Sequence, residues 1–235
     1  MAGTLFLIPT SLGPTSPNDI LPAGVQARVR TLRYFIAERP RTARAFLKQI
    51  DSGFPLSEAR IATLDEHTPA EVLASLLAPL DAEDGGLISE AGAPAVADPG
   101  AELVRLAHAR GLRVAPLVGP SALLLALMAS GLEGQRFAFH GYLPVDKAEL
   151  ARRLRECEAA SRELRQTQIF IETPYRNDRL MAALLRTCEK ETLVCVATDL
   201  TLATESVRTA TIAEWRREPA TIGKHPTVFL LLAST

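Results

Sequence analysis

The 235-residue sequence predicts an α/β protein of two domains, the first built on a parallel sheet and the second on a mixed sheet. In the amino-terminal half, short apolar runs alternate with longer segments of helical periodicity, which is typical of βαβ units. In the carboxyl-terminal half, several strand-like runs follow one another without an intervening helix, which is typical of a mixed sheet.

The amino-terminal half contains five strand-like runs separated mainly by helical segments. We expect strands at 4–9, 33–37, 60–64, 86–89 and 113–117. We expect helices, in which apolar residues recur at helical spacing, at 23–32, 41–50, 69–80 and 101–110. Crossover helices of this kind connect parallel strands.

The second half begins after a Gly-Pro pair, and the predicted domains are 1–118 and 119–235. Its expected helices are 122–131, 147–165 and 176–190. Its expected strands are 137–142, 168–172, 193–198, 206–210 and 227–232.

Composition excludes several classes of protein. The 26 Lys and Arg residues nearly cancel the 27 Asp and Glu residues, so no overall charge draws the chain to nucleic acid or to a membrane. No apolar run approaches the roughly 18 residues of a membrane span, and the amino-terminal run is too short for a signal peptide. We therefore expect a soluble, cytoplasmic protein.

The cysteines and histidines do not have the spacing of a metal site. Cys157, Cys188 and Cys195 are far apart and are expected to be buried free thiols. The four histidines show no ligand spacing such as His-x-x-x-His, so we expect no metal.

Three clusters rich in glycine and proline follow predicted strands, at 9–14, 89–100 and 119–122. Loops at the carboxyl ends of parallel strands line the ligand crevice of such folds, and glycine allows close approach to the backbone. Ser121 can cap the next helix, whose free N–H groups could hold a carboxylate. Ordinary turns and an ordinary cap explain any one cluster equally well.

Two nucleotide-binding motifs are absent from the sequence. No Gly-x-Gly-x-x-Gly follows the first strand, and no Gly-x-x-x-x-Gly-Lys-[Ser/Thr] occurs. NAD-dependent dehydrogenases and nucleoside triphosphatases are therefore disfavoured.

Six stretches together resemble the tetrapyrrole methylase superfamily, and within it the 16S ribosomal RNA cytidine 2'-O-methyltransferase family. They are 88–100, 118–122, 129–132, 139–144, 169–176 and 195–201. The resemblance implies a homodimer that binds S-adenosylmethionine in the cleft between the two domains and transfers its methyl group to ribosomal RNA.

The resemblance also implies which residues line the cofactor. In the amino-terminal half and at the start of the second half they are Pro9, Leu12, Gly92, Ala93, Val96, Ser121 and Ala122. In the carboxyl-terminal half they are Ile171, Asp199 and Thr227.

The chain departs from the family pattern where substrate is expected. The family's Pro-x-Gly-Asn-x-x-Asp-Ile becomes a longer loop from Pro9 to Ile20, and its Ala-Glu-Asp-Thr-Arg becomes Ala-Glu-Arg-Pro-Arg at 37–41. A small-molecule or tetrapyrrole methyltransferase, or a cofactor-binding protein without catalysis, therefore stays open.

The catalytic residue is not assigned by the sequence. Four carboxylates near the motif loops could act as a base, but each is more often a helix cap or dipole partner. They are Glu38, Glu90, Asp98 and Glu172.

A run of basic residues beside the first loop could neutralise RNA phosphates, and a solvated helix face explains it equally well. The run consists of Arg28, Arg30, Arg33, Arg39, Arg41, Arg44 and Lys48, and Glu38 is the acid expected to oppose it.

Overall fold

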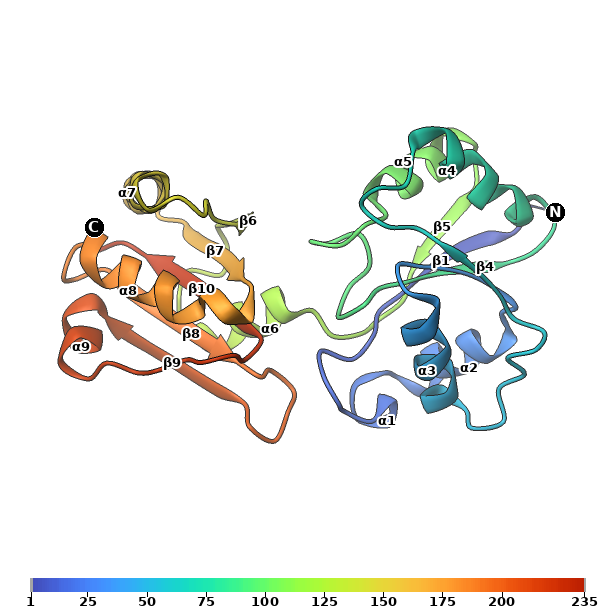
Figure 1. Ribbon diagram of the computed structural model, residues 1–235, viewed down its shortest axis with the longest axis horizontal. Helices are drawn as coiled ribbons and strands as arrows, with labels where there is room; N and C mark the ends of the chain where they lie inside the picture. The colour runs from blue at the N-terminus through green and yellow to red at the C-terminus, as the bar shows by residue number, and fades with distance from the viewer. Residues whose placement is uncertain (1, 235) are drawn as a thin grey trace. The chain divides into compact units, whose positions relative to one another are not determined.

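The computed structural model describes residues 2–234 and divides into two compact units (Figure 1). Unit 1 ends at Ser121, and unit 2 begins at Ala122. Each unit is an α/β domain, as the sequence predicts.

Unit 1 contains a parallel sheet with helices on both faces. Its strands are β1 (Thr4–Ile8), β2 (Tyr34–Ala37), β3 (Arg60–Thr63), β4 (Gly85–Ile88) and β5 (Arg113–Pro116). Its helices are α1 (Pro17–Ile20), α2 (Ala23–Thr31), α3 (Pro40–Ile50), α4 (Ala70–Leu77), the 3-10 helix η1 (Ala78–Asp81) and α5 (Ala101–Ala109).

The strand order in unit 1 is β3-β2-β4-β1-β5, and every neighbouring pair is parallel. The prediction of a parallel sheet is therefore confirmed. Because β1, β4 and β5 are adjacent, the loops that follow them emerge at one edge of the sheet.

Alternate residues of each unit 1 strand face opposite layers of helices. Phe6, Phe35 and Ile88 pack with α2 and α3 in one apolar cluster. Leu5, Ile36 and Leu87 pack with α4 and α5 in a second cluster on the other face. Figure 1 shows the two pairs of helices on opposite sides of the sheet.

Unit 2 contains a five-stranded sheet and several helices, of which the 18-residue α7 is the longest. Its strands are β6 (Phe137–Tyr142), β7 (Thr167–Glu172), β8 (Leu193–Thr198), β9 (Ser206–Thr211) and β10 (Thr227–Leu232). Its helices are α6 (Ala122–Ser130), α7 (Lys147–Leu164), the 3-10 helix η2 (Pro174–Arg176), α8 (Asn177–Thr187) and α9 (Ile212–Arg217).

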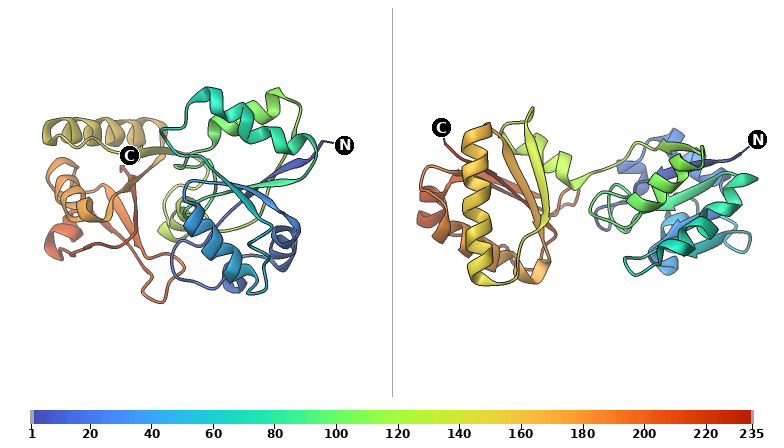
Figure 2. Two further views of the ribbon diagram at one scale, coloured as in Figure 1. Left: turned by 45° about the vertical axis from the view of Figure 1, so that its right-hand side comes forward. Right: turned by 90° about the horizontal axis from the view of Figure 1, so that it is seen from above.

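The unit 2 sheet has the order β6-β7-β10-β8-β9 and is mixed, as predicted. β6 and β7 are parallel, whereas the other neighbouring pairs are antiparallel. Helices α7, α8 and α9 share one apolar cluster with Phe170 and Phe229 of the sheet. Figure 2 shows α7 lying along the sheet from two further directions.

Four short segments differ from the expected elements, one of them the 3-10 helix η2, which forms just before the helix expected at 176–190. The helix expected at 69–80 ends at Leu77 and continues as the 3-10 helix η1, because Pro79 cannot donate a helical hydrogen bond. Helix α1 forms where a loop was expected, and Ser16 Oγ accepts from Asn18 N. Helix α9 was also not expected, although Thr211 and Glu214 form a capping box that the sequence contains.

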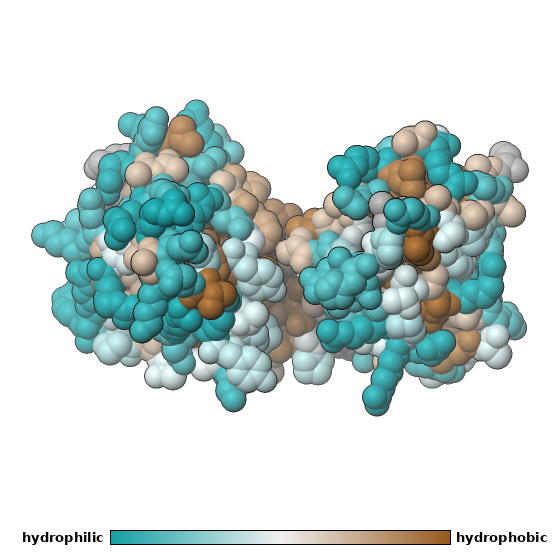
Figure 3. Space-filling view, turned by 45° about the horizontal axis from the view of Figure 1, so that its top comes forward, coloured by the Kyte–Doolittle hydropathy of each residue, from teal (hydrophilic) through white to brown (hydrophobic). Residues whose placement is uncertain are grey.

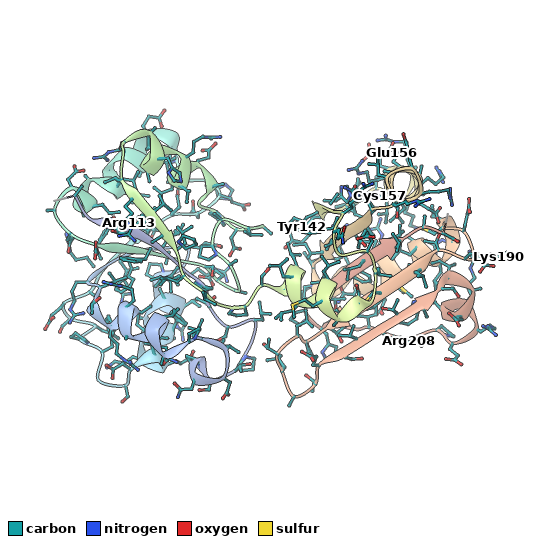
Figure 4. The ribbon with its side chains drawn as sticks, turned by 180° about the vertical axis from the view of Figure 1, so that it is seen from behind. Arg113, Tyr142, Glu156, Cys157, Lys190 and Arg208 are labelled. Atoms are coloured by element: carbon teal, nitrogen blue, oxygen red, sulfur yellow. The ribbon has the colours of Figure 1, made fainter. Side chains whose placement is uncertain are left out.

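The prediction of buried free thiols is confirmed for Cys157, Cys188 and Cys195. Cys157 lies on α7, next to the exposed Glu156 (Figure 4). Burial raises the pKa of all three thiols, that of Cys188 to about 12. These cysteines therefore stay protonated and pack as small apolar side chains.

Charged and polar side chains cover most of both units on the face shown in Figure 3, where apolar side chains gather in small groups. No helix within residues 2–234 has the length and apolar character needed to cross a membrane.

Candidate active site

Loops that follow β1 and β4 are joined directly at the carboxyl edge of the unit 1 sheet. Thr10 N donates to the Gly92 carbonyl at 3.0 Å, and Gly92 N donates to the Thr10 carbonyl at 3.2 Å. This pair forms an isolated antiparallel bridge between residues 82 positions apart. The bridge holds the first two of the three predicted site loops side by side.

Buried hydroxyl groups reinforce this bridge. Ser89 Oγ donates to the Gly92 carbonyl at 2.5 Å, and Thr10 Oγ1 lies 3.2 Å from Ser89 Oγ. Both side chains are buried. Buried hydrogen bonds of this kind fix the geometry of the two loops.

The third loop approaches the other two through glycine and proline. A Cβ atom at Gly119 would lie 2.2 Å from Pro9 Cγ, so the contact with the first loop requires glycine. A Cβ atom at Gly92 would lie 3.1 Å from Leu12 Cδ2 and 3.6 Å from the Pro120 carbonyl oxygen. Gly92, with a φ of +74°, is therefore the point where all three loops meet.

Strained backbone continues through the β4–α5 loop. Ala95 and Ala97 adopt φ angles of +61° and +60°, which residues other than glycine adopt uncommonly. Such strain clusters at ligand sites. Val96, between them, leaves 47% of its surface exposed. An apolar side chain at the tip of a strained loop is available for contact with a ligand.

The predicted unit 1 residues thus come together from three separate loops. Pro9 and Gly92 are buried, whereas Leu12, Ala93 and Ser121 are partly exposed. Ser121 directly precedes α6, whose first residue is the predicted site residue Ala122.

Three of the four predicted residues of unit 2 also come together, at the ends of adjacent strands. Thr227 pairs with Thr198 of β8 and with Glu172 of β7, and the next residue pairs with Ile171. Asp199, immediately after β8, donates its backbone N–H to the Pro226 carbonyl at 3.0 Å. Ile171, Asp199 and Thr227 therefore occupy one end of the β7-β10-β8 group.

Asp199 is the charged centre of this group. It is 5% exposed, and its Oδ2 lies 2.7 Å from His225 Nδ1 and accepts from Thr204 Oγ1 at 2.7 Å. Its φ of +50° is left-handed, a conformation that Asp tolerates better than most residues. The sequence gives no sign of this role for His225, because its contact with Asp199 depends on the fold.

A second buried polar side chain supports the same end of the sheet. Asn177 Nδ2 donates to the Gly223 and His225 carbonyls at 3.0 and 2.7 Å and to Thr227 Oγ1 at 3.2 Å. Asn177 is fully buried. It fixes the segment that carries His225 and Thr227, and sequence analysis did not identify it.

The structure brings together three of the four candidate carboxylates. Glu38, Glu90 and Asp98 line one small cavity in unit 1. Burial, followed by repulsion from Glu38 and Glu90, raises the pKa of Asp98 to about 6. Arg39 partly compensates, with its guanidinium nitrogens 3.6 Å from Glu38 and 3.9 Å from Glu90.

Glu172, the fourth candidate, lies in unit 2 and is occupied by structural contacts. Its Oε2 is 2.8 Å from an Arg176 guanidinium nitrogen, and its Oε1 accepts from Thr173 N at 2.7 Å. The side chain is almost wholly buried. This carboxylate positions the segment after β7.

The expectation that the basic run is opposed only by Glu38 was wrong. Arg28, Arg30 and Arg33 have the acidic partners Asp84, Asp51 and Glu58. These acids are distant in sequence and approach only through the fold. Of the run, Arg41, Arg44 and Lys48 have no acidic partner within residues 2–234.

The described part of the chain contains no group of three His, Cys, Asp or Glu side chains able to hold a metal ion.

Comparison with known proteins agrees with this arrangement. Residues 10–215 match the family described as Tetrapyrrole (Corrin/Porphyrin) Methylases. The ribosomal RNA small subunit methyltransferase I of Pseudomonas aeruginosa is 35% identical over 91% of this chain and 72% of its own length. The protein of the same name from Xylella fastidiosa is 35% identical over 93% of this chain and 76% of its own length.

A solved structure shares the fold at low identity. Uroporphyrin-III C-methyl transferase from Thermus thermophilus, complexed with S-adenyl homocysteine, matches with a TM-score of 0.57 and 16% identity. The match covers 98% of this chain and 97% of that chain. From the family match and the two close relatives, we conclude that this chain belongs to the tetrapyrrole methylase family and, within it, to the ribosomal RNA small subunit methyltransferases I.

Proposed function

We propose that this protein uses S-adenosylmethionine to methylate RNA of the small ribosomal subunit at a ribose 2'-hydroxyl group, in the cytoplasm. The observation that carries the proposal is the bridge between Thr10 and Gly92, which joins two of the three site loops, with the third loop in close approach at Gly119 and Pro120. The names of the relatives from Pseudomonas aeruginosa and Xylella fastidiosa support the substrate.

In this proposal unit 1 holds part of the cofactor and the acceptor. Pro9, Leu12, Gly92, Ala93 and Val96 line the cofactor, with Ser121 close to the start of α6. Gly92 carries no side chain, and a Cβ atom there would lie 3.1 Å from Leu12 Cδ2, so a larger residue would crowd the meeting point of these loops. The solved structure with S-adenyl homocysteine supports the same class of ligand.

Unit 2 carries its own set of proposed cofactor residues. Ala122, Ile171, Asp199 and Thr227 are the proposed residues. The Asp199 carboxylate is held by His225 and Thr204, so its position is fixed before a polar group of the ligand arrives. Charge-assisted hydrogen bonds to a fixed carboxylate are short and strong.

When bound, S-adenosylmethionine supplies an electrophilic methyl group on its sulfonium sulfur. The acceptor hydroxyl would take up this methyl group as the carbon–sulfur bond breaks, and its proton would pass to a base or to water. The residues of this chain contribute mainly by holding the acceptor in line with the methyl group, which can lower the barrier substantially.

We also propose that the protein acts as a homodimer. Strand β6 lies at the edge of the unit 2 sheet and exposes Phe137 and Tyr142, the latter 58% exposed (Figure 4). Leu124 and Met128 of α6 are exposed as well. Apolar side chains on an unpaired edge favour association. Light scattering of the purified protein tests this, and a monomer at micromolar concentration contradicts it.

Transfer of a labelled methyl group tests the function. We expect label from S-adenosylmethionine to enter RNA of small ribosomal subunits and to be recovered as a 2'-O-methylated nucleoside after nuclease digestion. Label in a tetrapyrrole fraction instead would favour small-molecule methylation. Cofactor binding without any labelled product would favour a binding protein without catalysis.

A further inference from the structure

His225 and Asp199 form a hydrogen-bonded pair at the end of the unit 2 sheet. Asp199 directly follows β8, and His225 comes two residues before β10, which is the neighbour of β8 in the sheet (Figure 1). The imidazole Nδ1 lies 2.7 Å from the carboxylate Oδ2. The Asp199 side chain is buried, whereas 55% of the His225 side chain is exposed. One partner is therefore fixed inside the protein, and the other presents its ring to solvent.

Three hydrogen bonds hold Asp199 independently of His225. Its backbone N–H donates to the Pro226 carbonyl at 3.0 Å, and its carbonyl accepts from Leu202 N at 2.9 Å. Thr204 Oγ1 donates at 2.7 Å to the same carboxylate oxygen that faces the imidazole. The carboxylate therefore has a defined position and orientation.

The segment that carries His225 is held as well. Asn177 Nδ2 and Thr227 Oγ1 both donate to the His225 carbonyl, at 2.7 and 2.8 Å. Asp178 Oδ1 accepts from Ile222 N at 2.7 Å. Because Asn177 is fully buried, its hydrogen bond is shielded from water. The imidazole therefore extends from a fixed backbone.

The chemistry of the pair determines which ring nitrogen carries the proton. An ionised carboxylate only accepts hydrogen bonds, so Nδ1 of His225 donates to Asp199. Nε2 of the neutral ring then has a free lone pair, and it makes no hydrogen bond to any of residues 2–234. A carboxylate in this position fixes the tautomer of an imidazole and offsets the charge of the imidazolium that forms when Nε2 takes up a proton.

The other three histidines lack this arrangement. His140 uses both ring nitrogens in hydrogen bonds, at 3.1 and 2.6 Å. His67 lies 3.5 Å from the Glu66 carboxylate, but both side chains are largely exposed, so nothing fixes that pair. His108 is an exposed residue in the last turn of α5. Among the histidines of the described chain, His225 alone combines a fixed, buried carboxylate with an open ring nitrogen.

We propose that His225 is the general base of the methyl transfer, with Nε2 as the atom that takes the proton of the acceptor hydroxyl. Asp199 acts through His225 as its positioning residue. The inference rests on the proposed function, because it assigns a role in that reaction. His225 contacts Asp199 and lies two residues before Thr227, so its exposed ring is beside the proposed cofactor residues of unit 2.

The proton step balances in charge and electrons. The hydroxyl proton moves to Nε2, and the electron pair of the O–H bond stays on the acceptor oxygen. That oxygen takes up the methyl group, and the electrons of the broken carbon–sulfur bond remain on sulfur. The Asp199 carboxylate offsets the positive charge of the imidazolium through the 2.7 Å hydrogen bond. Because the ring is exposed, water then removes the proton and restores the neutral base.

Replacement of the imidazole tests the role of His225. Gln can still donate to Asp199, so His225→Gln should keep the fold, but an amide does not take up the proton. With small ribosomal subunits and S-adenosylmethionine at saturation, we expect its rate of methyl transfer to fall about 100-fold. Its affinity for S-adenosylhomocysteine, measured by calorimetry, should stay within about three-fold. His67→Gln removes another histidine beside a carboxylate and is the matched control, with full turnover expected.

Chemical rescue separates proton transfer from a structural contribution. His225→Ala leaves an opening at an exposed position, which added imidazole can enter. We expect imidazole at about 0.1 M to raise the turnover of this variant about ten-fold. The double variant with Asp199→Ala should not respond, because nothing then orients the added base. A His225→Ala protein that loses turnover and does not respond to imidazole indicates a structural role and overturns the assignment.

The tautomer of His225 provides a test that needs neither cofactor nor substrate. At a pH where the ring is neutral, the NMR chemical shifts of its ring nitrogens should show the proton on Nδ1, because Asp199 accepts it. Asp199→Ala removes the acceptor and should abolish this preference. His67, which lies on the exposed surface, is the internal control and should not change.

The inference and the proposed function fail separately. Full turnover of His225→Gln on small ribosomal subunits overturns the assignment of His225 and leaves the proposed function intact. An unaltered protein that transfers no methyl group to RNA overturns the proposed function and the assignment together. A proton on Nε2 of the neutral His225 ring in the unaltered protein overturns the assignment whatever the activity.

Discussion

Thr10 and Gly92 exchange two backbone hydrogen bonds, at 3.0 and 3.2 Å, and Ser89 Oγ donates a third to the Gly92 carbonyl. These bonds connect the loops after β1 and β4 across 82 residues of sequence. These hydrogen bonds hold the two loops of the candidate site in fixed positions, which neither β1 nor β4 would do by itself.

Ser89→Ala removes the side-chain part of this connection. We expect unfolding to become easier by about 1–2 kcal/mol, because the buried Gly92 carbonyl and Thr10 hydroxyl lose a partner. Affinity for S-adenosylhomocysteine should fall about ten-fold as the loops loosen. Chemical denaturation measures the change in stability, and calorimetry measures the change in affinity. Full affinity in a destabilised variant would show that cofactor binding does not need the hydrogen bond of Ser89.

Gly92→Val is expected to abolish cofactor binding while the fold survives. A β-branched residue is strongly disfavoured at a φ of +74°, and its Cβ would lie 3.1 Å from Leu12 Cδ2. Circular dichroism should show the native secondary structure. Gly134→Val, at a position with open space around it, is the control, and unchanged calorimetric affinity in Gly92→Val would remove this loop from the site.

Asp98→Asn should stabilise the protein more at pH 8 than at pH 4.5. The pKa of Asp98 is raised from an ordinary 3.8 to about 6, so ionisation opposes folding. Its favourable contribution is present below about pH 4 and is lost as the pH rises through 6. After allowance for partial exposure we expect a gain of about 1 kcal/mol at pH 8.

Thermal denaturation at the two pH values measures this difference, with an expected rise in Tm of about 2–4 °C at pH 8. Glu102→Gln, which removes an exposed carboxylate on α5, is the control. The same Tm change for Asp98→Asn at both pH values would contradict the raised pKa.

Asp199→Asn should keep the fold and lower affinity for S-adenosylhomocysteine about ten-fold. Asn tolerates the left-handed backbone at this position, but it lacks the charge that pairs with His225. His225→Ala separates two roles for Asp199. A similar loss in both variants indicates that the pair orients the carboxylate, whereas a loss only in Asp199→Asn indicates direct contact with the ligand.

The three cysteines should resist thiol reagents in the native protein. Burial raises the pKa of each thiol, and the reactive species is the thiolate. We expect less than one equivalent of a disulfide reagent to react at pH 8 within an hour and three equivalents to react in denaturant. Rapid reaction of the folded protein would show that a unit opens readily.

Local patterns in the sequence are sufficient to predict every strand and most helices of this protein. Apolar residues alternate or recur at the period of the element they form, so runs such as Thr4–Ile8 and Thr227–Leu232 are recognisable without tertiary information. The α-helix predicted at 69–80 is shorter in the structure, because Pro79 interrupts the hydrogen bonding that apolar periodicity alone would continue. The sequence also indicates the three loops rich in glycine and proline, whose assignment to the cofactor stays a prediction.

Only the tertiary structure decided which charged and polar side chains share a site. Glu38, Glu90 and Asp98 meet because the loops after β2 and β4 emerge at one edge of a sheet, and Asp199 meets His225 across 26 residues. The acids that pair with Arg28, Arg30 and Arg33 also come from other elements. Periodicity depends on neighbours along the chain, whereas pKa values, ion pairs and cavities depend on neighbours in space, which folding alone brings together.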